Sequence, residues 1–296
     1  MPLIRNSSRG DGASILDFYD VHTRIGENCC GSGGEILKCK RLCDGQDFAV
    51  KKIAKRTSLE GKGQLSIWQM LQHRNIIEMK DWFEDVDSLF IVMELAEGGD
   101  MYDRIVKSKK MAEKDAVIAF SQILSAVNHM HSRNVVHCDL KPENILCMTN
   151  DDDTVKLCDF GFSQQIDNSS QMLKYQGTLT YTAPEVIDGR MYDSKADMWS
   201  LGVLLYSMLA GFAPFGQGES RSKIIAKIRQ CNLNFNYDAF RGVSEEAMDL
   251  IRKLVIPTPH QRLSAAEALK HPWISKNVIS DDRVDSLAEN LKALRT

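Results

Sequence analysis

The chain has 296 residues, a length that suits two lobes better than one small domain. Its 37 basic and 40 acidic residues leave a net charge of −3, which gives no reason to expect nucleic acid or a membrane surface as the main partner. No apolar run approaches the roughly 18 residues of a membrane span. The start, Met-Pro-Leu-Ile-Arg, resembles neither a signal peptide nor a myristoylation site. The eight cysteines lack paired zinc-ligand spacing, so we expect a reduced, intracellular protein, cytoplasmic with the nucleus not excluded.

The first third of the chain predicts a small β-rich lobe. Residues 1–16 are polar and contain glycine, so we expect a disordered N-terminal extension there. Over 17–97, short β-rich runs surround one helix, which we expect at 63–72. The runs lie at 19–22, 34–39, 47–50 and 89–93. Together they predict an antiparallel sheet with one main helix.

Helices dominate the larger part of the chain, 98–274. Val117, Phe120, Leu124 and Val127 recur at helical spacing, so one face of 113–132 should be buried. Residues 197–210 are apolar almost all round, as in a helix at the centre of a domain. We treat 275–296 as a C-terminal extension.

The most informative segment is 137–144, His-Cys-Asp-Leu-Lys-Pro-Glu-Asn, which is followed by Asp159-Phe160-Gly161. Two apolar runs within 145–158, separated by Asn-Asp-Asp-Asp, predict a hairpin that carries Asn144 and Asp159 to the same place. Phosphoryl transfer from ATP needs a carboxylate to orient and deprotonate the acceptor hydroxyl, and oxygen ligands for Mg²⁺. Asp139 fits the first need, and Asn144 and Asp159 fit the second.

Two further motifs complete the pattern, Phe48-Ala49-Val50-Lys51 and Ala183-Pro184-Glu185. With 137–144 and 159–161, they resemble the signature set of a eukaryotic Ser/Thr protein kinase, over roughly residues 20 to 275. The resemblance implies an α+β, bilobal protein-kinase fold with its N-lobe at 17–97 and its C-lobe at 98–274. It also implies transfer of the γ-phosphoryl of ATP, with Mg²⁺, to Ser/Thr hydroxyls of protein or peptide substrates.

The resemblance places a phosphate-binding loop after the first strand. The sequence there departs from the family's pattern, because Asn28 stands at the second glycine and Gly33 at the valine. Asn tolerates positive φ better than most residues, so the backbone at Asn28 can still approach the phosphates closely. We expect a loop that is more flexible than usual. The alternative is an ordinary turn. It is less favoured because Lys51, a strand lysine, follows. The nucleotide contacts implied here are Ile25, Gly26, Asn28, Gly31 and Gly33.

The resemblance also implies a pocket for the rest of the nucleotide. Lys51 would contact the α- and β-phosphates, with Lys52 as the alternative. Period-2 alternation puts Lys51 and Ala49 on the same, cleft-facing side, with Ala49 against the adenine. The other implied adenine-site residues are Met93 as gatekeeper, Glu94 and Ala96 through their backbones, and Leu146 as the floor.

The helix residue that pairs with this lysine in the family aligns with Gln64. A neutral amide can hydrogen-bond to Lys51 but cannot neutralise it. Glu60 lies one turn earlier and shares that face only if the helix extends through Gly61 and Gly63, at a cost of about 1 kcal/mol each. We expect this departure to affect full activity rather than ATP binding.

The transfer and substrate residues follow from the same resemblance. Lys141 would neutralise the transferred phosphoryl, and Thr178 would hydrogen-bond to Asp139 and Lys141. Asp100 and Glu143 stand where basophilic kinases bind an arginine three residues before the acceptor, through bidentate pairing. The alternative for these two is a pair of solvated surface acids.

Regulation is predicted from two places. Cys138 replaces the usual catalytic-loop Arg, so phosphorylation within 162–182 has less charge to neutralise and should matter little. Residues 195–206 and 271–274 resemble the calcium/calmodulin-dependent group, which includes calcium-dependent kinases, yet the chain contains no EF-hand loop. The segment 283–295 carries apolar residues at helical spacing. One interpretation is an autoinhibitory segment, to which calmodulin or a calcium-sensor domain would bind. The other is a terminal helix packed on the large lobe.

Two functions remain to be weighed. The leading hypothesis is an active Ser/Thr protein kinase. The alternative is a nucleotide-binding, pseudokinase-like scaffold, which Gln64, Asn28, Gly33 and Cys138 favour.

Overall fold

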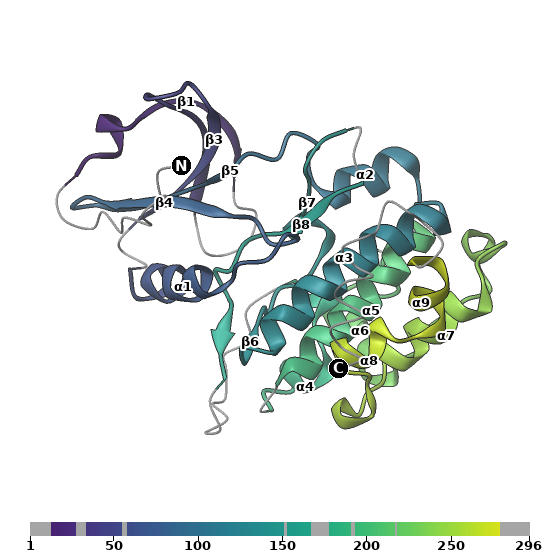
Figure 1. The fold of residues 1–296 in the computed structure, drawn as a ribbon. Coiled ribbons are helices and arrows are strands. Elements are labelled where there is room, and N and C mark those ends of the chain that lie inside the picture. Colours follow the sequence, from purple (N-terminus) through teal and green to yellow (C-terminus); the bar gives the residue numbers. More distant parts are fainter. Residues whose placement is uncertain are drawn as a thin grey trace.

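The computed structural model describes residues 13–27, 34–54, 58–150, 153–166, 178–190, 193–216 and 218–278, with the backbone alone at 26–27, 58–62 and 278. A small lobe built on one sheet sits beside a larger helical lobe (Figure 1). This is the α+β, bilobal arrangement that the sequence predicts. Within the ranges given, no helix is both long and apolar enough to cross a membrane.

The small lobe is an antiparallel sheet in the order β1-β2-β3-β5-β4. Its strands are β1 (Tyr19–Glu27), β2 (Gly34–Arg41), β3 (Asp47–Ala54), β4 (Met79–Glu84) and β5 (Ser88–Glu94). Four of them include the predicted runs. Strand β4 was not predicted, because Met-Lys-Asp-Trp-Phe-Glu mixes charged and apolar residues without clean alternation. Its pairing with β5 makes it a strand, which only the tertiary structure reveals.

Side chains on the two faces of β3 pack into different apolar clusters. Phe48 and Val50 belong to an apolar cluster with Ile15, whereas Ala49 lies in the main core and Lys51 is buried beside it. Ile15 lies in the single-turn helix η1 (Ile15–Asp17), whose capping box is formed by Ser14 and Asp17. Residues 13–16 therefore belong to the small lobe, which corrects the expected extension at 1–16; residues 1–12 lie outside the described ranges.

Helix α1 (Ser58–Met70) differs from the predicted helix at 63–72. It begins five residues earlier, and both Gly61 and Gly63 lie inside it. Tertiary packing overcomes their low helix propensity. Trp68, on the face toward the core, is 3% exposed and donates its indole N–H to the carbonyl of Ile77 at 2.8 Å.

The large lobe is built around helix α5 (Ser194–Ala210), in which every residue from Ala196 to Ala210 is buried, as its apolar sequence predicts. Helix α3 (Glu113–His131) packs against α5 and also contacts α8 and α9. The other helices are α2 (Met101–Ser108), α4 (Pro184–Ile187), α6 (Arg221–Gln230), α7 (Glu245–Leu254), α8 (Ala265–Leu269) and α9 (Pro272–Val278). Helix α9 runs past residue 275, where the C-terminal extension was expected to begin. The segment 283–295 lies outside the described residues, so its two interpretations stay open.

A short hairpin lies between the lobes (Figure 1). It pairs β7 (Ile145–Cys147) with β8 (Val155–Leu157), as predicted, and a second small ladder pairs β6 (Val135–Val136) with β9 (Gln164–Gln165). The connection from the small lobe bonds to the hairpin, because Gly98 donates its N–H to the Cys147 carbonyl at 3.1 Å. A Cβ at Gly98 would lie 2.4 Å from the carbonyl oxygen of Thr149, so this close approach requires glycine.

Candidate active site

Asp197, in the first turn of α5, anchors the loop that carries Asp139. Its carboxylate accepts the backbone N–H groups of His137 at 2.9 Å and Cys138 at 3.0 Å, and lies 2.9 Å from Nε2 of His131. Burial alone raises the pKa of this carboxyl, but the hydrogen bond and charge of His131 and the His137 N–H outweigh it and lower the pKa. Cys138 has a φ of 69°, so the anchor holds a left-handed backbone that a cysteine rarely adopts.

Asp139 lies in a closely bonded cluster. Its carboxylate accepts the backbone N–H of Thr178 at 3.2 Å and lies 3.1 Å from Nζ of Lys141. Lys141 also donates to the hydroxyl of Thr178 at 2.9 Å, and the side-chain amide of Asn144 donates to the Asp139 carbonyl and carboxylate at 2.7 and 3.1 Å. The expected bonds of Thr178 are therefore present. Asp139, Lys141 and Asn144 are all buried.

Asp159 is bonded to residues outside this cluster. Its Oδ1 forms an ion pair with Nζ of Lys51 at 2.8 Å and accepts the N–H of Gly161 at 3.1 Å. Burial alone would raise the pKa of Asp159, but the charge and hydrogen bond of Lys51 and the Gly161 N–H together lower it. The carboxylate is thus kept ionised, and Oδ2 is buried with no hydrogen-bond partner among the described residues.

Gln64 makes no bond with Lys51 in this arrangement. The Gln64 side chain is 3% exposed, and its Nε2 has no partner in the described part of the chain. Glu60 does lie within α1, but its side chain is outside what the structure describes. One turn beyond Gln64, Trp68 contacts the ring of Phe160 with centroids 5.3 Å apart. This contact directs that face of α1 toward the Asp159–Phe160 segment.

Of the residues expected to contact adenine, Ala49 lies on β3, Met93 on β5 and Leu146 on β7. Ala49 pairs with Met93 across β3 and β5, and both are buried. Leu146 packs half-buried against the core, and Ala96 makes no backbone hydrogen bond with another described residue. Ile25, near the end of β1, is 48% exposed. In the phosphate loop, the backbone of Gly26 belongs to β1, whereas Asn28, Gly31 and Gly33 lie outside the described residues.

Glu94 differs from the other adenine-site candidates because its polar groups are already bonded. Its backbone N–H donates to the carbonyl of Glu78 at 3.0 Å, and its carboxylate pairs with Lys156 at 2.6 Å. The backbone N–H and the carboxylate of Glu94 are therefore both engaged by other residues of the protein.

The two acids predicted to contact substrate lie in different settings. Asp100 caps α2 by accepting the N–H of Asp103 at 2.8 Å. Glu143 is more enclosed, and its Oε2 is buried without a hydrogen-bond partner among the described residues. Burial raises the pKa of both carboxyls, and the charges of Asp100 and Asp139 add to the rise at Glu143. The buried Oε2 distinguishes Glu143 from a fully solvated acid, whereas Asp100 is half-buried, and the two interpretations of this pair stay open.

Comparison with known proteins identifies the family. The family model described as the protein kinase domain matches residues 19–274. The chain belongs to the protein kinase family. This kinase domain is 39% identical to calcium-dependent protein kinase 29 of Arabidopsis thaliana over 91% of its own length, and 40% identical to the calcium/calmodulin-dependent protein kinase cmkA of Emericella nidulans over 85%. A probable myosin light chain kinase of Dictyostelium discoideum is 33% identical over the full chain.

These relatives support the serine/threonine type and the calcium/calmodulin-dependent group that the motifs predict. The kinase domain spans 51% of the plant protein, 62% of the fungal one and 76% of the Dictyostelium one. It thus corresponds to a part of the longer relatives.

One functional contact of the kinase domain was not predicted. Phe160 lies between Trp68 and His137, whose ring centroid is 5.6 Å from that of Phe160. His137 also accepts the Asp139 N–H through Nδ1 at 3.3 Å. These two tilted and edge-on ring contacts connect α1 to the loop that carries Asp139. The signal for it was present in Trp68, a large apolar residue one turn after Gln64.

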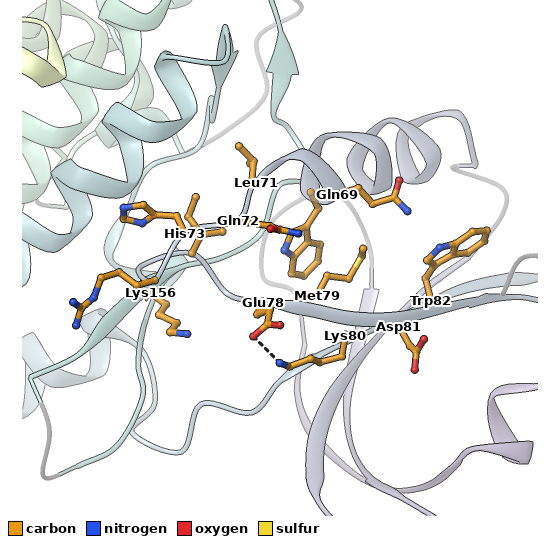
Figure 2. Close-up of a pocket in the computed structure, with 13 residues that line it drawn as sticks. Gln69, Leu71, Gln72, His73, Glu78, Met79, Lys80, Asp81, Trp82 and Lys156 are labelled. Carbon is orange, nitrogen blue, oxygen red and sulfur yellow. Dashed lines mark ion pairs between the residues drawn. The ribbon is translucent and has the colours of Figure 1, made fainter. Parts of the chain in front are cut away.

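One cavity of the kinase domain lies apart from this site. It has a volume of about 650 Å³ and opens between the end of α1, the loop at 71–78 and β4 (Figure 2). Trp68, Met79 and Trp82 contribute its apolar wall, and none of the predicted site residues lines it. Two residues that line the cavity contact the candidate site: Trp68 contacts Phe160, and Lys156 pairs with Glu94.

Proposed function

We propose that this kinase domain is catalytically active and transfers the γ-phosphoryl of ATP, in the presence of Mg²⁺, to Ser/Thr hydroxyls of protein substrates. The observation that carries the proposal is the cluster of Asp139, Lys141, Asn144 and Thr178. Its members are connected by hydrogen bonds and an ion pair of 2.7–3.2 Å. A site with this many bonds is organised before substrate arrives, which lowers the reorganisation that catalysis requires.

The residues that would hold Mg²⁺ are Asn144 and Asp159. Asp159 is ionised, and its Oδ2 is a buried acceptor in need of a partner. No group of three or more His, Cys, Asp or Glu side chains that would form a complete protein cage for a metal occurs within the described ranges. Magnesium is typically held by one or two carboxylates together with substrate phosphates, so this donor set fits it. Bound there, the ion would neutralise the charge of the phosphates.

Asp139 is the proposed catalytic base. Its carboxylate would orient the acceptor hydroxyl and take its proton as the oxygen attacks phosphorus. Lys141, which lies 3.1 Å from that carboxylate, would place a positive charge near the transferred group. Thr178 fixes both side chains, since its N–H binds Asp139 and its hydroxyl binds Lys141.

The nucleotide would lie against Ala49, Met93 and Leu146, with Lys51 at its phosphates. Lys51 supports this role because it is buried, positively charged and directed at Asp159. Ala96 has free backbone groups for the base within the described structure.

The proposed substrate preference is basophilic. Glu143 has a buried acceptor without a partner in the described ranges, and Asp100 shares its electrostatic surroundings. A guanidinium group pairs well with such carboxylates through several N–H donors. An arginine three residues before the acceptor would supply them.

A calcium sensor is the proposed partner of the C-terminal segment 283–295. The relatives are named as calcium-dependent or calcium/calmodulin-dependent kinases, and each is longer than this chain. We propose that calmodulin or an attached sensor domain contacts this segment. The intracellular location stays a prediction.

The scaffold hypothesis has one observation in its favour, Gln64, whose side chain forms no bond with Lys51 or Asp159. It differs from the proposed function in predicting nucleotide binding without transfer.

The deciding experiment measures phosphate incorporation from Mg-ATP into a Ser peptide library, with Asp159→Asn as the control. We expect incorporation by the parent and none by the control, with Arg enriched three residues before Ser. Binding of Mg-ATP without incorporation would support the scaffold instead.

A further inference from the structure

The counterion of Lys51 lies on the segment after β8 and not on helix α1. Among the described residues, the carboxylate of Asp159 is the one within ion-pair distance of its Nζ, at 2.8 Å. The two side chains are 3% and 7% exposed. In such an enclosed pair, each charge depends on the other, because a buried charge that loses its partner is strongly destabilised.

Gln64 could have bound Lys51 together with Asp159, but it forms no bond with the lysine. Its buried side chain lies one turn before Trp68 on the same face of α1, where Trp68 contacts Phe160 next to Asp159. A carboxylate at position 64 would add a second negative charge near Lys51. The amide adds none, and its Nε2 has no hydrogen-bond partner in the described part of the chain.

We propose that Asp159 serves both as the counterion of Lys51 and as a metal ligand, and that the neutral Gln64 thereby makes metal and nucleotide binding strongly interdependent. This inference rests on the proposed function and extends it. A divalent cation at Oδ2 of Asp159 competes with Lys51 for one carboxylate and places two positive charges close together. The phosphates of a nucleotide supply the missing negative charge to both.

The consequence is a thermodynamic coupling. Metal alone binds poorly, and nucleotide without metal binds poorly, but each increases the affinity for the other by the same factor. A carboxylate at position 64 would hold Lys51 independently of Asp159. It would therefore strengthen metal binding in the absence of nucleotide and reduce the coupling factor.

The first experiment measures the dissociation constant of ADP by calorimetry, without metal and with saturating Mg²⁺. The ratio of the two constants is the coupling factor, for which we expect a value on the order of a hundred in the parent. Gln64→Glu should lower it about tenfold. Two controls accompany this variant. Gln64→Met changes the shape of the side chain but keeps it neutral. Gln69→Glu adds the same negative charge at an exposed position of α1. Both should keep the parental factor.

The second experiment does not depend on Gln64→Glu folding. It measures Mn²⁺ alone by electron paramagnetic resonance with the parent and with Lys51→Met. Removal of the competing lysine should strengthen Mn²⁺ binding in the absence of nucleotide by about tenfold.

Each outcome has a distinct meaning. An unchanged coupling factor in Gln64→Glu, or an equal loss in Gln64→Met, overturns the inference and leaves the proposed function intact. Unchanged or weaker Mn²⁺ binding by Lys51→Met also overturns it. Failure of the parent to bind ADP even with Mg²⁺ would instead contradict the proposed function.

Discussion

The transfer side of the site and the nucleotide side are built differently. Around Asp139, the side chains of Lys141, Asn144 and Thr178 bond to one another, and the loop is anchored by Asp197. Around Asp159, one ion pair with Lys51 is accompanied by buried polar atoms that lack partners in the described ranges.

This difference shows which part of the site is complete in the protein alone. Unpartnered buried polar atoms cost free energy, and a bound cation would satisfy the one at Asp159. We propose that the fold organises the transfer side, and that bound metal and nucleotide organise the nucleotide side. The predictions that follow test this contrast, beginning with the largest effect.

Asp139→Asn should abolish most of the transfer without affecting the fold. The amide is nearly isosteric but cannot accept the hydroxyl proton, and general-base catalysis contributes on the order of 10²–10⁴-fold. We expect kcat to fall by about 10³-fold, while the affinity for Mg-ADP changes little. Asp238→Asn, at an exposed carboxylate, is the matched control. Retention of parental kcat by Asp139→Asn would remove Asp139 from the chemistry.

Glu185→Gln tests how the segment that ends in Ala-Pro-Glu is held. Both Glu185 oxygens bind Arg262, at 2.6 and 2.7 Å, and the arginine is fully buried. Loss of one partner leaves a buried charge unpaired, so the free energy of unfolding should fall by about 3–5 kcal/mol in urea titrations.

The control for that variant is Glu246→Gln, because Glu246 forms an exposed pair with Lys276. Exposed pairs contribute about 0–1 kcal/mol. Equal effects of the two variants would mean that the buried pair does not hold the segment.

Glu143→Gln should weaken binding of arginine-containing peptides. A charge-assisted pair with a guanidinium is worth about 1.5–3 kcal/mol, so KM should rise about 10- to 100-fold while kcat stays near the parental value. The same peptide with Arg replaced by Ala serves as the control, and its KM should be the same for parent and variant. A KM that is unchanged for both peptides would restore the solvated-acid interpretation.

The pH dependence of that KM provides a related test. Burial raises the pKa of Glu143 and of Asp100, so each carboxyl takes up a proton at a higher pH than usual. Only the ionised form attracts arginine. As pH falls, the KM of the arginine peptide should therefore begin to rise at a pH where a solvent-exposed glutamate would still be fully ionised. The KM of the alanine peptide should not follow this curve.

The smallest effect is expected from replacing Ser169 and Ser170 together by Ala. Cys138 brings no positive charge for a phosphate to neutralise, and the cluster around Asp139 is already bonded without one. The double variant should keep most of its activity in the peptide assay. A loss of more than about tenfold would contradict this view of the transfer side.

Those parts of the fold and site that depend on local pattern were predicted from the sequence. The apolar residues of α5 predicted its central position, and the two runs around Asn150 predicted the hairpin of β7 and β8. Alternation along β3 predicted that Ala49 and Lys51 share a buried side. The same hairpin was predicted to carry Asn144 toward Asp159, and the N–H of Cys158, next to Asp159, donates to the Asn144 carbonyl at 3.0 Å.

Long-range contacts were beyond such reasoning. The start of α1 at Ser58 contradicts the propensity of Gly61 and Gly63, because packing of the helix outweighs it. Strand β4 has no clear alternation and depends on its pairing with β5. No local pattern indicated that Ile15 belongs to the small lobe.

By itself, the sequence determined the residue types at the site, their order along the chain and the family to which the chain belongs, because these depend on local motifs. Only the tertiary structure decided that Lys51 pairs with Asp159 and that Gln64 does not pair with either of them. Ion pairing and burial depend on side chains brought together from β3, α1 and the loop after β8. Residues so far apart in sequence acquire a common electrostatic environment only when the two lobes pack together.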